Sequence, residues 1–251
     1  MKDRQARILK LLEENDRATI SHMKALYNVS EMTLRRDITQ LEEMGYVTKI
    51  HGGVIARKKL LFDRSFSRRE KEHQDEKKMI AKEAVRLMKP GENIILDTGT
   101  TTLYVARELV KKNLPLTVAT TSLMVASTLF NSSVEVLLFG GFLRREIPDL
   151  IGPLTEKNLM EFHSDKLFIG CNGILVEEGF YTSDLNISQL EKKMVENTEM
   201  VILVTDSSKF GIKSFVKCAD ISIVHTVITD TNIDAVSVKN LENRGIRVIV
   251  V

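Results

Sequence analysis

Hydrophobic positions divide this 251-residue chain into two regions with different periods. In about the first sixty residues the apolar side chains recur every three or four positions, which indicates amphipathic helices. The predicted elements are a helix ending near Asn15, a helix over about 21–27, a third helix with Leu34, Ile38 and Leu41 as its buried stripe, and a hairpin of strands 46–50 and 54–55. Short helices followed by a hairpin predict a small domain at the N-terminus.

A tight turn joins the second and third of these helices. Asn28 and Val29 interrupt the helical pattern, and Ser30 stands where the N-terminal cap of the third helix is expected. Gly45 is expected to end that helix, and Gly52 to turn the hairpin. Helix, turn, helix and hairpin in this order predict a winged helix-turn-helix, a module that places one helix in a groove of duplex DNA.

The exposed face of the third helix carries the candidate DNA-reading residues. With Leu34 buried, Arg36 falls on the opposite face, where its guanidinium can reach a guanine edge or a phosphate. Arg35 lies at the rim, which suits a phosphate contact. The residues expected to contact DNA are Ser30, Met32, Thr33, Arg35, Arg36, Gln40, Lys49 and His51. Two alternatives stay open: the arginines form local ion pairs on a solvated helix, or the module assembles with another protein.

Beyond about residue 75 the hydrophobic pattern changes. After a helix over about 75–88, short and continuously apolar strands alternate with helical stretches, at 93–97, 116–119, 134–139, 166–169, 200–204, 224–229 and 248–251. Apolar strands separated by helices predict an α/β domain with a Rossmann-like, mostly parallel sheet covered on both faces. The charged stretch between the two regions then predicts a DNA-binding domain over 1–57, a linker over 58–74 and a C-terminal domain over 75–251.

Charge and cysteine content narrow the classes of protein. Residues 1–60 hold twelve Lys and Arg against eight Asp and Glu, whereas the remainder holds twenty-four against twenty-six. A basic N-terminal module suits a polyanionic partner. Cys171 and Cys218 are the only cysteines, and no spacing of Cys and His resembles a metal site, so neither a metal nor another cofactor is expected. No apolar run approaches the roughly 20 residues that span a bilayer, so a cytoplasmic protein without a membrane partner is expected.

A loop rich in glycine and threonine follows the first strand of the second region. Free backbone N–H groups, hydroxyls and the positive end of a helix dipole suit a phosphate monoester, although a simple helix cap is the alternative. Further polar residues follow later strands, and ligands collect at the carboxyl ends of parallel strands. The residues expected to bind an anionic effector are Asp97, Thr98, Gly99, Thr100, Thr101, Thr102, Thr121, Ser122, Gly140, Gly141, Arg144 and Lys209.

One run of residues in the N-terminal domain is specific. Residues 29–38 read Val-Ser-Glu-Met-Thr-Leu-Arg-Arg-Asp-Ile, and residues 49–53 read Lys-Ile-His-Gly-Gly. This run resembles the signature of the DeoR family of bacterial transcriptional regulators, Val-Ser-x-x-Thr-Ile-Arg-Arg-Asp-Leu followed by a His-Gly-Gly wing. Leu34 and Ile38 are conservative changes from it. The resemblance continues through residues 172–174, and it covers nearly the whole chain.

The resemblance implies a sugar-phosphate sensor domain related in fold to ribose-5-phosphate isomerase, with Asn172 and Gly173 at the effector. It also supplies an alternative function, an isomerase-like enzyme fused to a helix-turn-helix. The isomerases carry Asp-Gly-Ala-Asp-Glu where residues 169–173 read Ile-Gly-Cys-Asn-Gly, so the acids that would move a proton are missing. Asn172 and Glu191 stand where the family more often has Asp and Lys, which implies an effector other than the family's commonest ones.

These observations together predict a DNA-binding transcriptional regulator and not an enzyme, with no catalytic residue. The resemblance favours a repressor of a carbohydrate-utilisation operon that is controlled by a phosphorylated sugar. A single winged module makes few contacts with DNA, so the protein is expected to bind a double-stranded operator as a homo-oligomer, either a dimer or a tetramer.

Overall fold

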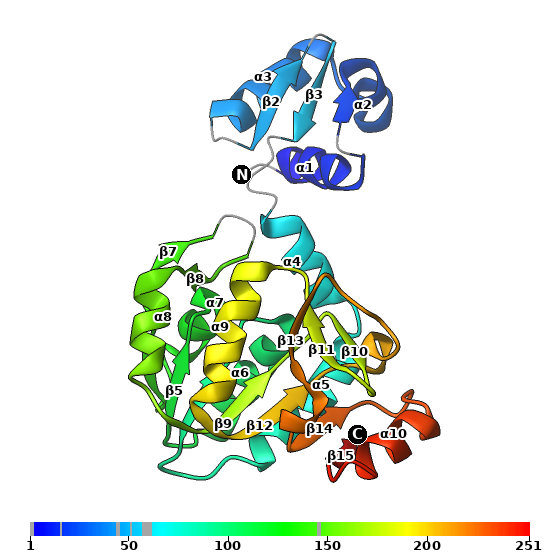
Figure 1. Cartoon of the computed structure of the whole chain (residues 1–251). Coiled ribbons are helices and arrows are strands. Elements are labelled where there is room, and N and C mark those ends of the chain that lie inside the picture. The colour runs from blue at the N-terminus through cyan, green and yellow to red at the C-terminus, as the bar shows by residue number, and fades with distance from the viewer. Residues whose placement is uncertain (1–2, 16, 44–45, 51, 57–61, 145–146) are drawn as a thin grey trace. The chain divides into compact units, whose positions relative to one another are not determined.

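The computed structural model describes residues 3–15, 17–43, 46–50, 52–56, 62–144 and 147–251 of the chain. The chain separates into an N-terminal unit, Met1–Arg64, and a C-terminal unit, Ser65–Val251. Figure 1 draws both units in one view. The stretch 58–74, predicted as a linker, contains helix α4 (Phe62–Lys71), and its residues from Ser65 onward belong to the C-terminal unit.

The N-terminal unit is the predicted winged helix-turn-helix. Its elements are α1 (Asp3–Asn15), β1 (Arg17–Thr19), α2 (Ile20–Tyr27), α3 (Glu31–Glu43), β2 (Val47–Ile50) and β3 (Gly53–Ala56). The turn between α2 and α3 depends on Asn28, which adopts a left-handed backbone with φ of 50° and whose N–H donates to the carbonyl of Lys24. Gly45, expected to end α3, lies outside the described residues.

The core of this unit contains the predicted stripe of the third helix. Leu34, Ile38 and Leu41 are all buried in one apolar cluster, which also includes residues of α1, α2 and the strands. Asp37 on the same helix is buried as well, and it accepts a hydrogen bond from Arg4 Nε at 2.5 Å. The buried ion pair joins α1 to α3, so it helps fix the orientation of the third helix.

The wing is part of a three-stranded sheet rather than a hairpin alone. The strands lie in the order β1-β3-β2, and β1 was not predicted because it spans only three residues. Gly52 turns the hairpin with φ of 74°, a conformation that glycine adopts without strain. Gly53 passes so close to β1 that a Cβ atom there would lie 2.6 Å from the carbonyl oxygen of Ala18. Both glycines are therefore required by the geometry of the wing.

The C-terminal unit is built on a seven-stranded parallel sheet with strand order β15-β14-β12-β9-β4-β5-β6. The strands are β4 (Asn93–Leu96), β5 (Thr117–Thr120), β6 (Glu135–Leu138), β9 (Ser164–Ile169), β12 (Thr198–Val204), β14 (Thr226–Thr229) and β15 (Arg247–Val250). All seven correspond to strands predicted from apolar runs. The predicted α/β class with a mostly parallel sheet is confirmed.

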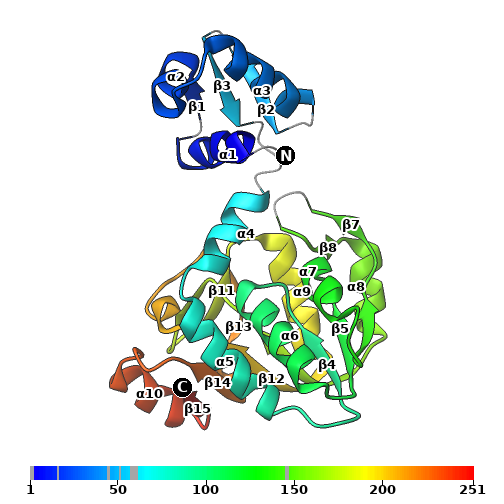
Figure 2. The ribbon, with the colours of Figure 1, turned by 180° about the vertical axis from the view of Figure 1, so that it is seen from behind.

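Helices cover both faces of this sheet, as Figures 1 and 2 show from opposite sides. On one face lie α5 (Gln74–Arg86), α6 (Thr100–Lys112) and α7 (Leu123–Leu129), and on the other lie α8 (Pro153–Met160), α9 (Leu185–Glu196) and α10 (Ala235–Glu242). Successive residues of one strand point to opposite faces, so Ile94 and Leu96 enter one core and Ile95 the other. Burial on both sides explains why the strands read as continuously apolar.

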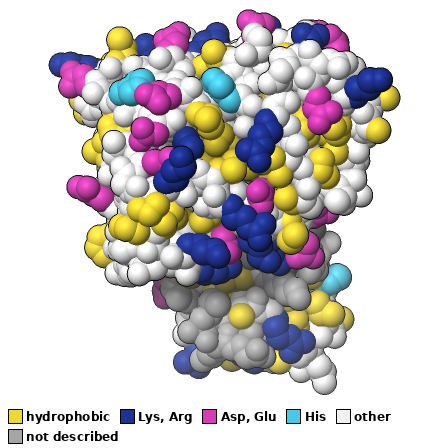
Figure 3. All heavy atoms as spheres, turned by 90° about the horizontal axis from the view of Figure 1, so that it is seen from below, with side chains coloured by type: hydrophobic (Ala, Val, Ile, Leu, Met, Phe, Trp, Pro, Cys, Tyr) yellow, Lys and Arg dark blue, Asp and Glu magenta, His cyan; other side chains and the backbone are white. Residues whose placement is uncertain are grey.

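Smaller elements complete the unit. The antiparallel sheet β10-β11-β13 contains β10 (Gly173–Leu175), β11 (Gly179–Thr182) and β13 (Val216–Asp220), and β7 (Phe142–Leu143) pairs with β8 (Leu150–Ile151). None of these strands was predicted. Seen from below, Lys and Arg, Asp and Glu, and hydrophobic side chains are interspersed over the surface (Figure 3), as suits a chain with a formal net charge of +2.

We expect α3 to depend on its buried stripe and not on its exposed apolar side chain. Leu34→Ala removes a completely buried side chain and should lower the free energy of unfolding of the N-terminal unit by about 2–5 kcal/mol. Met32→Ala on the same helix is the control, because Met32 is 81% exposed, and its effect should stay within about 0.5 kcal/mol. Urea unfolding of the full chain, followed by circular dichroism, measures both; equal effects would contradict the packing.

Candidate functional site

The start of α3 is fixed by a hydroxyl cap. The N–H of Thr33 donates to Ser30 Oγ at 3.3 Å, and the two hydroxyl oxygens lie 2.9 Å apart. The predicted cap at Ser30 is therefore confirmed. The two hydroxyls thus contact each other. They lie beside the first turn of the helix, whose N–H groups readily donate hydrogen bonds to a phosphate oxygen.

The outward face of α3 presents an arginine to solvent. Arg36 is exposed and, in the part of the chain that the structure describes, forms no hydrogen bond or ion pair. Its neighbour Arg35 instead pairs with Glu31 one turn earlier, at 2.6 Å between Nη2 and Oε1. Met32 is also exposed on this helix. The unpaired guanidinium of Arg36 is thus available for a polyanion, as the helix pattern predicts.

The other predicted DNA contacts lie in different surroundings. Gln40 is half-buried, and its side-chain carbonyl accepts a hydrogen bond from Gln5 Nε2 at 2.7 Å, so it also ties α3 to α1. Lys49 on β2 is exposed and its Nζ lies 2.8 Å from Glu42 Oε2. His51 lies outside the described residues.

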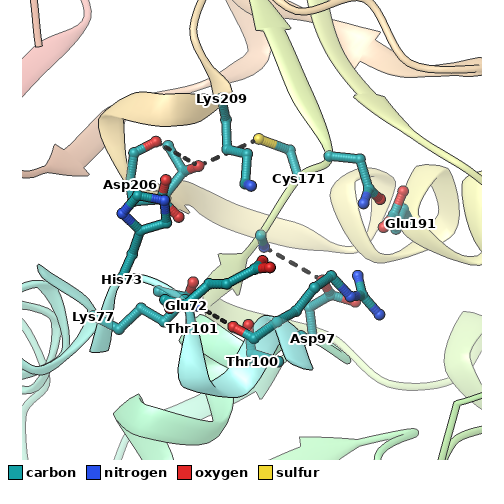
Figure 4. A pocket seen from close by; sticks show the side chains of 15 residues that line it. Glu72, His73, Lys77, Asp97, Thr100, Thr101, Cys171, Glu191, Asp206 and Lys209 are labelled. Atoms are coloured by element: carbon teal, nitrogen blue, oxygen red, sulfur yellow. Dashed lines mark hydrogen bonds between the residues drawn. The ribbon is translucent and has the colours of Figure 1, made fainter. Parts of the chain in front are cut away.

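The C-terminal unit contains a polar pocket beyond the carboxyl ends of β4, β9 and β12 (Figure 4). Its empty space, with the solvent at the open mouth included, is about 590 Å³. The lining residues are Arg69, Glu72, His73, Lys77, Asp97, Gly99, Thr100, Thr101, Gly170, Cys171, Asn172, Glu191, Thr205, Asp206 and Lys209. Six of the predicted effector residues are among them: Asp97, Gly99, Thr100, Thr101, Asn172 and Lys209.

The glycine-threonine loop is held as a preformed helix start. Gly99 caps α6, and its N–H donates to Thr102 Oγ1 at 2.9 Å, while the Thr102 hydroxyl donates to the carbonyl of Asp97 at 2.6 Å. Thr102 is completely buried, so its hydroxyl shapes the loop. Thr100 and Thr101 line the pocket in the first turn of α6, where backbone N–H groups have no partner within the helix. The loop therefore forms a rigid helix start, the geometry that the predicted anion site requires.

Cationic side chains converge on the pocket from three elements. Lys209 follows β12 in a short 3-10 helix (Ser207–Lys209) and points into the pocket in Figure 4. Lys77 of α5 is only 3% exposed, and its ammonium donates to the carbonyls of Arg69 and Glu72. Burial lowers the pKa of Lys77, and burial together with the nearby Arg144 lowers the pKa of Arg69. A bound anion would relieve both effects, because it compensates the buried positive charge.

Two buried carboxyl groups lie elsewhere in the same pocket. Asp97 is 4% exposed, its Oδ2 accepts from the N–H of Gly170 at 3.3 Å, and burial raises its pKa to about 6. Glu191 of α9 is also 4% exposed, its Oε2 lies 2.6 Å from Cys218 Sγ, and burial followed by the charge of Asp97 raises its pKa well above the usual value. The charge of Asp97 disfavours ionisation of Glu191, so the two groups together favour a proton or a cation.

The remaining predicted effector residues have other contacts. Thr98 and Thr121 join their hydroxyls at 2.9 Å, and Ser122 caps α7 by accepting from the N–H of Val125. Arg144 is held by Asp149 and Asp184, at 2.5 and 3.1 Å. These residues support the pocket from outside its lining.

Two predicted glycines serve close packing. A Cβ atom at Gly141 would lie 2.0 Å from Thr155 Oγ1, and one at Gly173 would lie 2.3 Å from the carbonyl oxygen of Ile212. The carbonyl of Gly140, the neighbouring predicted residue, accepts a hydrogen bond from Thr155 Oγ1 at 2.7 Å. None of the three glycines lines the pocket.

One wall of the pocket was not anticipated from the sequence. Arg69, Glu72, His73 and Lys77 come from the end of α4 and the start of α5, a stretch in which charged residues dominate. A stretch of charged residues is typical of a solvated connector, so nothing in it indicates that Lys77 is buried. His73, with φ of 52°, adopts the left-handed conformation that turns the chain between the two helices. That conformation carries no signal in a single sequence.

Comparison with known proteins agrees with the two units. The model of the DeoR-like helix-turn-helix domain matches residues 4–59, and that of the DeoR C-terminal sensor domain matches residues 72–231. Among solved structures, ribose 5-phosphate isomerase A of Methanocaldococcus jannaschii overlaps 55% of each chain at 23% identity, with a TM-score of 0.41.

Curated relatives match over nearly the whole length. The uncharacterised HTH-type transcriptional regulator YulB of Bacillus subtilis (strain 168) is 35% identical over 247 residues, 98% of this chain and 95% of that protein. The putative aga operon transcriptional repressor of Escherichia coli O157:H7 is 34% identical over 257 residues, 99% of this chain and 93% of that protein. Two domain models in the predicted order, with relatives of this extent, establish the family. The chain belongs to the DeoR family of transcriptional regulators.

Proposed function

We propose that this protein represses a carbohydrate-utilisation operon and that a phosphorylated sugar, bound in the C-terminal pocket, controls it. The observation that carries the proposal is the combination, in one chain, of a third helix with an unpaired Arg36 and a pocket whose cations surround a preformed helix start. The name of the E. coli relative, an aga operon repressor, supports the assignment to carbohydrate metabolism. Because its target is DNA, we propose a cytoplasmic protein.

In the proposed complex with DNA, α3 lies in the major groove and the wing beside it. Arg36 and Thr33 read base edges, with Met32 in contact with a base or sugar. Ser30, Arg35, Lys49 and His51 bind the phosphate backbone and so set the register. Gln40 contributes through its hydrogen bond to Gln5, which holds α3 in place.

In the proposed effector complex, the phosphate lies at the start of α6, against Gly99, Thr100 and Thr101, with Lys209 as its counter-ion. Asn172 and Asp97 hydrogen-bond the sugar hydroxyls. Thr98, Thr102, Thr121, Ser122, Gly140, Gly141, Arg144 and Gly173 position these groups from outside the lining. The number of polar groups in a small volume supports a ligand with several hydroxyls and one anion.

We further propose that the protein works as a homo-oligomer. Strand β6 lies at one edge of the large sheet, and Leu137, Leu138, Phe142 and Leu143 on β6 and β7 are exposed. Apolar side chains beside the outer edge of a sheet suit contact with a second copy. An effector that binds one arrangement of the copies more tightly would change DNA affinity by about 5- to 150-fold, for a coupling of about 1–3 kcal/mol.

An isomerase-like enzyme is the second candidate, because the pocket retains Asp97 and Glu191. We propose binding without turnover, since residues 169–173 lack the acids of the isomerase motif. The candidates differ in a direct assay: conversion of ribose 5-phosphate to ribulose 5-phosphate by the purified chain would favour the enzyme.

Loss of Arg36 should weaken DNA binding in two ways. Arg36→Ala is expected to cost about 1–3 kcal/mol on a DNA fragment that the wild-type protein selects from a randomised pool, and to relax the base preference at one position. Binding isotherms over a range of salt concentrations measure both effects. Arg86→Ala, which removes an exposed arginine from the C-terminal unit, should leave binding unchanged. Unaltered affinity of Arg36→Ala would exclude α3 as the reading helix.

Loss of Lys209 should weaken effector binding without affecting DNA. Lys209→Ala removes a charge-assisted contact with the phosphate and should lower affinity for sugar phosphates by about 10- to 100-fold, as seen in ligand-induced thermal shifts. Lys192→Ala, an exposed lysine on α9, is the control. If Lys209→Ala binds every sugar phosphate with wild-type affinity, the phosphate does not contact Lys209.

The raised pKa of Asp97 predicts how stability depends on pH. In the folded protein Asp97 keeps its proton up to about pH 6, whereas in the unfolded chain it loses the proton near pH 3.8. The free energy of unfolding therefore falls as the pH rises between these two values. Asp97→Asn removes the ionisation, and at pH 8 it should increase stability by up to about 3 kcal/mol relative to wild type. Urea unfolding at pH 4 and pH 8 measures the difference; an equal effect at both pH values would contradict burial of the charge.

A further inference from the structure

Acidic and basic side chains both line the effector pocket. Resting on the sugar-phosphate pocket proposed above, we propose that the effector of this protein carries a positively charged amino group in addition to its phosphate, and that Asp97 and Glu191 bind this amino group. The ligand class is therefore an amino sugar phosphate. Lys209, Lys77 and the start of α6 take its anionic end.

The carboxylates of Asp97 and Glu191 lack a cationic partner. Both side chains line the pocket and are 4% exposed. Within the described residues neither forms a salt bridge: Asp97 accepts only from backbone N–H groups, and Glu191 contacts only the thiol of Cys218. Two buried carboxyl groups that line one pocket and have no counter-ion form an incomplete site for a cation.

Arg144 does not complete this site. Arg144 acts electrostatically on both carboxyl groups, but its guanidinium is already bound by Asp149, at 2.7 and 2.5 Å, and by Asp184, at 3.1 Å. Its salt bridges are thus with Asp149 and Asp184, and in the described part of the chain it forms none with Asp97 or Glu191.

Lys209 and His73 lie apart from the two carboxyl groups. In Figure 4 Lys209 and His73 lie toward one side, and Asp97 and Glu191 toward the other, with Cys171 between Lys209 and Glu191. The Cys171 thiol, in turn, lies within electrostatic reach of Lys209, Asp206 and Glu191. Groups of both charges thus face one pocket, where a single ligand with an anionic and a cationic end can contact both.

An ammonium fits the acidic side better than the alternatives. A neutral hydroxyl would leave the charge of the carboxylates uncompensated, and in the described part of the chain no three acidic, His or Cys side chains come together as metal ligands would. An ammonium brings three N–H donors and one positive charge, which two carboxylates can share. In the empty pocket a proton takes its place, in agreement with the raised pKa of Glu191.

Calorimetric titration of the full chain tests the proposal with four probes: glucosamine 6-phosphate, galactosamine 6-phosphate, glucose 6-phosphate and galactose 6-phosphate. One amino sugar phosphate should bind about 10- to 100-fold more tightly than its neutral counterpart, the contribution of a charge-assisted hydrogen bond. Glu191→Gln, which keeps the shape of the side chain, should lose this preference and retain the affinity for the neutral sugar. Glu196→Gln, on the exposed side of the same helix, should keep the preference.

The outcomes separate this proposal from the proposed function. Equal affinity of wild type for amino and neutral sugar phosphates, or a preference that persists in Glu191→Gln, overturns the amino-group site and leaves the sugar-phosphate pocket standing. Binding of none of the four probes by wild type counts against both. N-acetylglucosamine 6-phosphate provides a check without any variant, because acetylation removes the charge of the nitrogen; it should bind wild type no more tightly than glucose 6-phosphate does.

Discussion

The convergence of parallel strand ends at one edge of the large sheet is the constraint on which the C-terminal unit depends. β4, β9 and β12 are neighbours in the sheet, and each is buried on both faces, so the backbone that leaves each strand has a fixed position. Asp97, Asn172 and Asp206, which follow the three strands, are brought together although they are far apart in sequence. Two apolar cores supply the stability that buried charges at this edge cost.

Buried charge gives the pocket its selectivity. Water is largely excluded around Asp97, Glu191 and Lys77, so their interactions with a ligand are stronger than those of exposed groups. The same exclusion makes each group costly in the empty protein, where a proton or a backbone carbonyl serves as a substitute partner. In the regulation that we propose, a ligand that supplies the missing charges binds one form of the unit more tightly than another, which is the requirement for control of a second site.

The sequence predicted elements with strong hydrophobic periods and missed those without one. The stripe of Leu34, Ile38 and Leu41 and the seven apolar strands were found because burial imposes a regular pattern. Strands β10, β11 and β13 are short and have no regular hydrophobic pattern. At the pocket, a threonine or serine after a strand has the same signature whether it lines the pocket, as Thr101 does, or caps a helix, as Ser122 does. Only the fold distinguishes the two.

Helix α4 connects the pocket with the N-terminal unit along the chain. Glu70 of α4 pairs with Arg107 of α6 at 2.5 Å, and Arg69 and Glu72 line the pocket, so this helix is packed on the sensor body. It begins at Phe62, and the last strand of the wing ends at Ala56, so α4 is the next described element of the chain after the helix-turn-helix. In the regulation that we propose, an occupant of the pocket changes how firmly α4 is held, and with it the freedom of two DNA-binding modules in an oligomer to find the correct separation along a duplex.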